Sequence, residues 1–140
     1  PWQHVLEPIS GYLSLAVSLK KSDKLSGQAY NFGPSSDNNF SVEQVLKEIS
    51  KYWEDAKWVL EDKELIENKE CLALKLNCDK AYNDLNWKSV LNFHDAIKDT
   101  VDWYKFFYFD RKNTSINDYT IMQIERYVNR AKNKGLEWSK

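Results

Sequence analysis

Tyr108 and Lys112 have the Tyr-x-x-x-Lys spacing, in which a lysine one helical turn away can lower the pKa of a tyrosine for proton transfer. The pair lies where a predicted helix runs into the polar stretch DRKNTSIND, and no Ser or Thr partner accompanies it. The four glycines, at positions 11, 27, 33 and 135, are too scattered for a P-loop or a dinucleotide-binding fingerprint. We therefore interpret the Tyr108–Lys112 spacing as a coincidence.

The histidines and cysteines do not form a metal-binding pattern. His4 and His94 lie far apart, with no companion Cys or paired carboxylate at ligand spacing. Cys71 and Cys78 are seven residues apart in ECLALKLNCD, and if this run is a strand the odd spacing places them on opposite faces. We predict that both cysteines are reduced and buried as small hydrophobic side chains.

Carboxylates and tryptophans are numerous enough to suggest catalysis or sugar stacking. The acidic residues of the stretch 61–67 are mixed with lysine, which is typical of a solvated loop. Trp53 and Trp103 lie on predicted helices rich in apolar side chains, so we assign them to the core. Trp2 is left without a packing explanation and is therefore a candidate binding residue.

The composition indicates one soluble domain. The chain has 140 residues and a net charge of -1, and its 20 basic and 21 acidic residues are dispersed, which favours neither nucleic acid nor anionic membrane as a partner. Charged residues interrupt every apolar stretch, so we predict no membrane span, no signal peptide and a cytoplasmic location. The length is short for a catalytic domain with its own cofactor-binding half.

Four main helices are predicted. The first runs from Val5 to Lys20, with apolar residues at helical spacing and Pro8 in the first turn. The second begins after Ser41, which forms a capping box with Gln44 and is flanked by a staple of Phe40 and Val45; its apolar stripe is Val42, Val45, Leu46, Ile49 and Trp53. A short helix around Asp79 to Leu85 follows later in the chain.

The third main helix is capped by Asn92, and the fourth by Thr120 with Gln123 and a staple of Tyr119 and Ile124. The third carries an apolar stripe: Phe93, Ala96, Ile97, Val101, Tyr104 and Tyr108. Three runs have strand composition: QAYNF, stopped by Gly33 and Pro34, and then AKWVLED and CLALKLN. The expected fold class is α/β, with four main helices and a few short strands.

A series of short motifs covers nearly the whole chain: PWQHVLEP, GQAYNFGP, FSVEQVL, LKLNCDKAYNDLNW, HDAIKDTVDWY and TIMQIERY. Some of their elements are general to sugar-nucleotide epimerases and dehydratases, whereas Trp-Gln-His-Val-Leu-Glu-Pro and Thr-x-x-Gln-Ile-Glu-x-Tyr are more specific. In this order they resemble the C-terminal part of the CDP-glucose 4,6-dehydratases, in the extended branch of the short-chain dehydrogenase/reductase superfamily.

The resemblance implies that residues 1–140 form a single C-terminal substrate-binding lobe, with the Rossmann core largely absent. In such enzymes an N-terminal Rossmann half holds NAD and the catalytic Tyr-x-x-x-Lys, so this fragment is expected to bind no cofactor and to be inactive alone. The whole enzyme would convert CDP-glucose to CDP-4-keto-6-deoxyglucose, for the deoxysugars of polysaccharides such as lipopolysaccharide O-antigen. Residues 28–33 would be a strand that joins the sheet of the Rossmann half.

The same resemblance implies five substrate-binding residues. Trp2, Gln3 and His4 occupy the segment beside the nucleotide cleft, where Trp2 or Gln3 would line the pocket. Lys69 and Glu70 match a place where relatives often have His-Glu-Ala, and Glu70 would hydrogen-bond the nucleotide. No metal is implied. The alternative for His4 is a structural histidine whose hydrogen bonds are satisfied within the chain.

A second interpretation of the whole chain remains open at this point. The chain could be a stand-alone sugar-nucleotide-binding or interaction module without catalysis. The fragment interpretation requires exposed apolar surface where the missing Rossmann half would dock, because a severed domain interface leaves a larger patch than a monomer normally shows. Self-association through that surface would favour the fragment.

Overall fold

The computed structural model describes residues 2–35, 38–59, 75–110 and 114–140. These residues form five α-helices and two short 3₁₀ helices: α1 (Leu6–Leu19), η1 (Asp23–Leu25), α2 (Val42–Tyr52), α3 (Asp79–Leu85), α4 (Phe93–Phe109), α5 (Ile116–Asn133) and η3 (Glu137–Ser139). The described ranges contain no β-strand, so the part of the chain that is seen is a helical lobe without a Rossmann core. None of these helices is long and apolar enough to cross a membrane.

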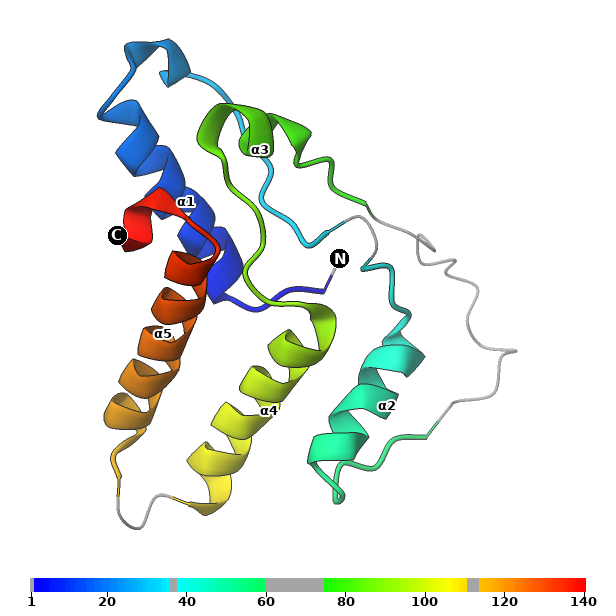
Figure 1. Ribbon diagram of the computed structural model, residues 1–140. Helices are drawn as coiled ribbons and strands as arrows, with labels where there is room; N and C mark the ends of the chain where they lie inside the picture. Colours follow the sequence, from blue (N-terminus) through cyan, green and yellow to red (C-terminus); the bar gives the residue numbers. More distant parts are fainter. Residues whose placement is uncertain (1, 36–37, 60–74, 111–113) are drawn as a thin grey trace.

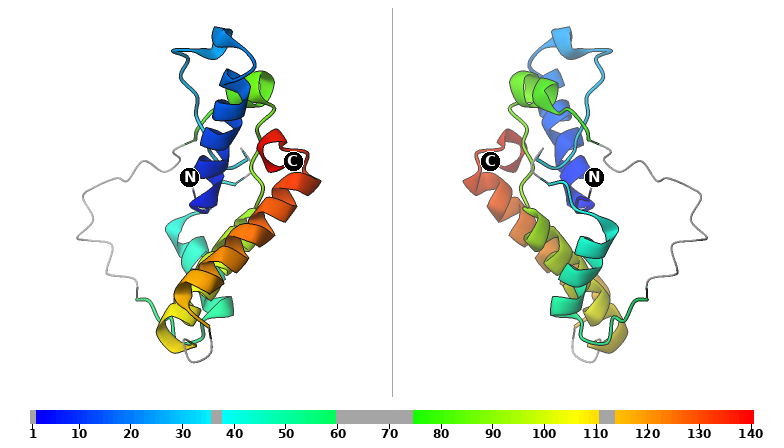
Figure 2. Two further views of the ribbon diagram at one scale, coloured as in Figure 1. Left: turned by 90° about the vertical axis from the view of Figure 1, so that its left-hand side faces the viewer. Right: turned by 90° about the vertical axis from the view of Figure 1, so that its right-hand side faces the viewer.

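The helices are arranged around an α4–α5 hairpin. In Figure 1, α2 lies along α4 on the side away from α5. Helices α1 and α3 lie beyond the end of the hairpin at which α4 begins and α5 ends. The chain's last turn, η3, packs against both α1 and α5. The two side views in Figure 2 show that α1 and the C-terminus stay close together while α2 remains beside α4. Helix α1 thus contacts helices from the middle and the end of the chain.

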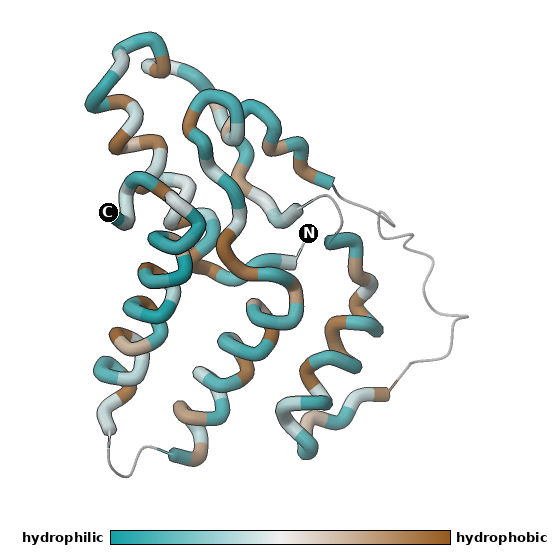
Figure 3. Tube along the Cα trace, viewed as in Figure 1, coloured by the Kyte–Doolittle hydropathy of each residue, from teal (hydrophilic) through white to brown (hydrophobic). Residues whose placement is uncertain are grey.

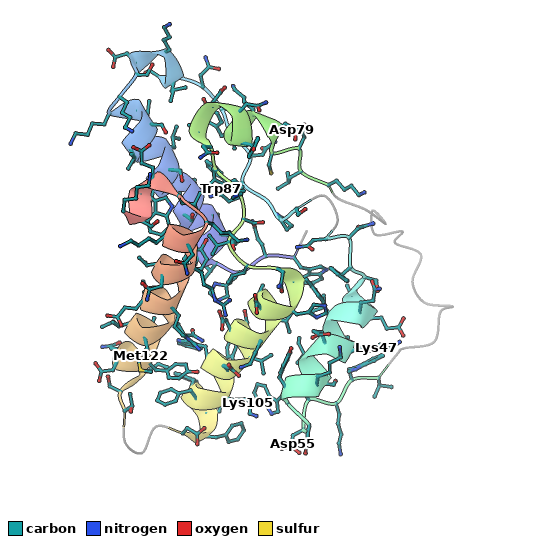
Figure 4. The ribbon with its side chains drawn as sticks, viewed as in Figure 1. Lys47, Asp55, Asp79, Trp87, Lys105 and Met122 are labelled. Carbon is teal, nitrogen blue, oxygen red and sulfur yellow. The ribbon has the colours of Figure 1, made fainter. Side chains whose placement is uncertain are left out.

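The core is centred on the connection between α3 and α4. Trp87 is 1% exposed, and Figure 4 shows it between α1 and this connection. Asn86 ends α3 in the left-handed conformation with φ 49°, which Asn tolerates better than most residues, and so turns the chain towards the core. The buried cluster comes from α3, this connection, α4, α5 and the C-terminal end: Ala81, Leu85, Trp87, Val90, Leu91, Ala96, Tyr127, Ala131 and Leu136.

Two of the predicted helix caps are confirmed. Ser41 Oγ accepts the Gln44 N–H at 3.2 Å while Gln44 Oε1 accepts the Ser41 N–H at 2.8 Å, which completes the capping box of α2. Asn92 Oδ1 accepts the Asp95 N–H at 2.8 Å at the start of α4. In both places a side chain satisfies an amide that has no partner inside its helix.

The predicted start of the last helix at Thr120 was wrong. Helix α5 begins at Ile116, because Ser115 Oγ accepts the Asp118 N–H at 3.1 Å and caps the helix one turn earlier. Thr120 lies inside the helix, where its hydroxyl donates to the Ile116 carbonyl at 2.8 Å. The Ser-x-x-Asp spacing is itself a capping signal, but it lies in a polar stretch that has the composition of a loop.

The predicted short strands do not form in the described residues. Residues 28–33 run without a ladder partner: the Asn31 amide donates to the Asn77 carbonyl at 3.3 Å, and the Gly33 N–H donates to Cys78 Sγ at 3.1 Å. A strand needs a second backbone to pair with, and the partner predicted for residues 28–33 is the sheet of a Rossmann half outside residues 1–140, so that pairing stays a prediction. The other two predicted strands, and the loop between them, lie mostly outside the described residues; 56–59 and 75–77 are not strands.

Helix α1 is confirmed within one residue at each end; Leu6 and Leu15 pack against the core, but several of its other apolar residues face outward. Its buried residues are small or polar: Glu7, Ser10, Gly11 and Ser14. A Cβ at Gly11 would lie 2.3 Å from the Phe32 ring, so only glycine allows that contact. The exposed apolar residues share one face, which we call the α1 stripe: Val5, Ile9, Tyr12, Leu13 and Ala16. Figure 3 shows hydrophobic colour recurring along this helix.

Candidate functional site

The predicted binding residues of the N-terminal segment lie against the chain around residue 40. Trp2 Nε1 donates to the Phe40 carbonyl at 3.0 Å, and the ring remains 41% exposed. The Gln3 side-chain amide donates to the Phe32 carbonyl at 3.1 Å. These bonds span 38 and 29 residues of sequence and fix the segment across the loop that leads into α2. Trp2 therefore packs on this loop, a contact that the sequence did not indicate.

His4 is buried, and one of its two ring nitrogens is bonded within the chain. It is 9% exposed, and its Nδ1 accepts the Leu6 N–H at 3.3 Å, which places the proton of the neutral ring on Nε2. Burial lowers the pKa of His4 below its usual value, although the charge of Asp99 opposes the shift. This arrangement favours the structural alternative for His4, and a contact of His4 with a ligand stays a prediction.

Gln3 has one unused acceptor. Its Oε1 is buried and has no hydrogen-bond partner among the described residues, although its amide nitrogen is bonded. A buried acceptor without a donor costs about 1–3 kcal/mol, so a ligand or neighbour that supplies a donor there would be favoured. Of the predicted binding residues that the structure describes, Gln3 has a buried side-chain atom left without a partner.

Two cavities are candidates for binding a ligand, and the N-terminal segment lines the first of them. The α4–α5 cavity, of about 460 Å³, lies between this segment and the helical hairpin; its walls include Gln3, His4, Val5, Trp103, Tyr104 and Ile124. The loop cavity, of about 420 Å³, lies beside the chain that precedes α2 and is more polar; its walls include Gly33, Pro34, Asn77, Cys78, Lys88 and Ser89. The first suits apolar groups, and the second offers hydrogen-bonding groups and one lysine.

A buried carboxylate ties α1 to the core. Glu7 is 2% exposed and accepts hydrogen bonds from the Val90 N–H at 2.9 Å, the Leu91 N–H at 2.6 Å and the Tyr127 hydroxyl at 3.0 Å. Burial raises the pKa of Glu7 although all three bonds oppose the shift, and burial together with Glu7 raises the pKa of Tyr127. Beside it, Ser10 Oγ accepts the indole N–H of both Trp87 and Trp138.

The sequence analysis missed this cluster. Glu7 was read only as part of a helix whose apolar residues stood out. A lone carboxylate among apolar residues was the available signal, because such a residue is buried only with partners. We assign Glu7 to the structure of the lobe, since protein donors occupy its oxygens.

A second carboxylate joins α2 to α4. Glu48 is buried, with Oε2 at 2.6 Å from Lys51 Nζ and Oε1 at 2.8 Å from His94 Nδ1. The Lys51 ammonium, and to a smaller extent the His94 ring, hold the pKa of the Glu48 carboxyl below its usual value against the effect of burial. Figure 4 shows Lys105 reaching from α4 towards the end of α2, where its Nζ donates to the Tyr52 carbonyl at 2.9 Å. These contacts position α2 and involve no cavity described above.

The other candidates are not brought together. Lys69, Glu70, Cys71 and Lys112 lie outside the described residues, so nothing about their roles is tested. Cys78 is a free thiol and half-buried rather than fully buried. Trp53 and Trp103 are half-buried, whereas the fully buried tryptophan is Trp87. Within the ranges that the structure describes, no group of three or more His, Cys, Asp or Glu could hold a metal ion.

A helical lobe with no Rossmann core in the described ranges agrees with the C-terminal lobe of a sugar-nucleotide dehydratase that the motifs predicted. No protein-family model matches the chain. The chain is 34% identical over 106 residues to the CDP-glucose 4,6-dehydratase of Salmonella typhimurium strain LT2. This similarity covers 75% of the chain but 29% of that enzyme, in its C-terminal part, and it confirms the resemblance drawn from the motifs.

Proposed function

We propose that residues 1–140 are the C-terminal, substrate-binding part of a cytoplasmic CDP-glucose 4,6-dehydratase. The similarity to the Salmonella enzyme supports this proposal, and it places the counterpart of this chain after most of that enzyme's length. The complete protein would convert CDP-glucose to CDP-4-keto-6-deoxyglucose with NAD bound by a preceding Rossmann part. Residues 1–140 alone would be inactive.

The glycines of this chain do not fit a dinucleotide. A Cβ at Gly11 would meet the Phe32 ring at 2.3 Å, and one at Gly33 would meet Leu76 at 3.1 Å, so neither backbone is open to a pyrophosphate. Gly27 and Gly135 have open surroundings and positive φ, but they follow a 3₁₀ helix and α5 rather than opening a helix after a strand. We therefore assign NAD binding and the hydride chemistry to the N-terminal part of the complete protein.

The observation that carries the proposal is the outward-facing α1 stripe. From Pro8 to Leu19 the helix has no charged residue, and Val5 and Tyr12 are 65% and 64% exposed. A helix of 14 residues is about 21 Å long, so the stripe can be covered by a domain without removing any ion from water. An uncharged apolar face of this length is characteristic of a surface that another domain covers.

On the substrate side, the proposal assigns the loop cavity to part of the sugar nucleotide. Trp2 and Gln3 are bonded to the stretch of chain that also contributes Gly33 and Pro34 to this cavity, but Gln3 itself lines the α4–α5 cavity, where its Oε1 would accept a hydrogen bond from the docked N-terminal part. Lys88 supplies a positive charge at the loop cavity and Asp79 a negative one, so the loop cavity can pair with both donors and acceptors of a polar ligand. Glu70 stays a predicted contact to the nucleotide.

The test is made on the polypeptide encoded by the complete reading frame. We expect it to consume CDP-glucose and form the 4-keto product, and residues 1–140 alone to form none. Leu13→Lys in the complete protein should lower turnover, because an ammonium in the covered α1 stripe is desolvated without a partner. Met122→Lys is the matched control, since Met122 is 53% exposed on α5 and lies outside the α1 stripe. Unchanged turnover in Leu13→Lys would contradict docking on α1.

A further inference from the structure

The polar side chains that α4 and α5 contribute to the wall of the α4–α5 cavity are bonded within the chain, whereas Gln3 Oε1 in the same wall has no partner among the described residues. Trp103 Nε1 donates to Thr120 Oγ1 at 2.8 Å, and the Thr100 and Thr120 hydroxyls each donate to a carbonyl one turn earlier at 2.8 Å. The Gln123 side-chain amide donates to a carbonyl of α4 at 2.7 Å. The surface that remains open to the cavity is mostly hydrocarbon and aromatic ring. Apart from Gln3 Oε1, a sugar or a phosphate would find few partners there, and the hydrocarbon surface favours an apolar group.

The cavity is continuous with the α1 stripe. Val5 belongs to both, and Tyr104 and Ile124 carry the apolar surface onto α4 and α5 with 47% and 41% of each residue exposed. A volume of about 460 Å³ is in the range of roughly 300–1,000 Å³ typical of ligand pockets, and it accommodates a bulky side chain. A partner that covers α1 would therefore also cover the opening of this cavity.

We propose that the α4–α5 cavity is the socket for a bulky apolar side chain of the N-terminal part of the same polypeptide. This rests on the proposed function, because that part supplies the occupant. In the Salmonella relative the unmatched length precedes the similar segment, and a preceding chain would join this lobe just before Trp2, at Pro1 of the sequence. Gln3 and His4, the next residues, already line the cavity. The covalent connection keeps the occupant at high effective concentration next to its socket.

The socket is distinct from the α1 stripe in what it contributes. The stripe is a convex helix face that fits many apolar surfaces, whereas a cavity with aromatic walls accepts one side chain in one position. Buried anchors of this kind hold a large share of the energy of an interface. The socket would therefore fix how the N-terminal part sits on the lobe.

The test is hydrogen exchange of the complete protein, unaltered and with Ile124→Lys. We expect the amides of α4 from Thr100 to Tyr104 to exchange about tenfold faster in Ile124→Lys, since a lysine at the opening opposes insertion of an apolar group. Met122→Lys is the control, because Met122 lies two residues away and so on the opposite side of α5. This control should leave exchange of α4 unchanged.

The outcomes separate the two proposals. If α1 is protected in the unaltered protein but α4 exchanges at the same rate in Ile124→Lys, the socket is overturned and docking on α1 stands. If Met122→Lys accelerates α4 as strongly as Ile124→Lys, the effect comes from α5 itself and the socket is again overturned. If α1 is unprotected in the unaltered protein, the docking proposal and the socket fail together.

Discussion

Replacement of Glu7 tests whether a single buried carboxylate joins α1 to the rest of the lobe. In Glu7→Ala, the Val90 and Leu91 N–H groups and the Tyr127 hydroxyl all lose their acceptor. Each buried donor left unsatisfied costs about 1–3 kcal/mol, and relief of the buried charge offsets part of the sum, so we expect a loss of about 3 kcal/mol. Glu7→Gln keeps one acceptor oxygen and should lose about 1–2 kcal/mol.

The assay is urea unfolding followed by tryptophan fluorescence, since Trp87 and Trp138 both donate to Ser10 on α1. Tyr127→Phe is the matched control, because it removes one of the three donors and leaves the carboxylate in place; its expected loss is about 1 kcal/mol. If Glu7→Ala unfolds within about 0.5 kcal/mol of the unaltered chain, the reasoning is refuted.

The same residue predicts a pH dependence. Burial raises the pKa of Glu7, so the folded chain holds its proton at a higher pH than the unfolded chain does. Its contribution to stability is complete below the ordinary carboxyl pKa and is lost as pH rises through the raised pKa of the folded state. Glu7→Gln removes this titration, so the difference between the two unfolding free energies should change with pH in that window. A constant difference would contradict the assignment.

Three further replacements have defined outcomes. Gly11→Ala should lower the thermal midpoint, because its Cβ would overlap the Phe32 ring, at a cost of about 1–3 kcal/mol. Glu48→Gln should loosen α2, measured as faster hydrogen exchange of that helix, and it should abolish the loss of stability expected as pH falls through the lowered pKa of Glu48. Ser115→Ala should cost about 1 kcal/mol in urea unfolding, and an equal cost for Thr120→Ala would contradict the observed cap.

The helices were predictable from the sequence where local chemistry decides them. The capping box at Ser41 and the cap at Asn92 each depend on two residues three apart, and both are confirmed. The start of α5 was misplaced because two capping signals occur close together, and the earlier one at Ser115 forms. Local patterns fix the type of an element better than its first residue.

Tertiary packing was not predictable in the same way. The apolar spacing of α1 correctly predicts a helix, but periodicity does not state which side faces the rest of the chain. The inward side is set by Glu7, Ser10 and Gly11, whose partners lie between 21 and 128 residues away in sequence. The candidate site depends on similar long-range contacts, since Gln3 and Trp2 are held by the loop before α2.

The last residues of the chain secure the first helix. Trp138 Nε1 donates to Ser10 Oγ at 3.0 Å across 128 residues, and Glu137 forms an ion pair with Lys21 just beyond α1. A ribosome adds about 5–20 residues per second, so α1 leaves the ribosome many seconds before η3 exists to hold it. In the complete protein proposed above, α1 would therefore meet the part made before it while this turn is still missing. Closure by the C-terminal turn would then complete the lobe around α1.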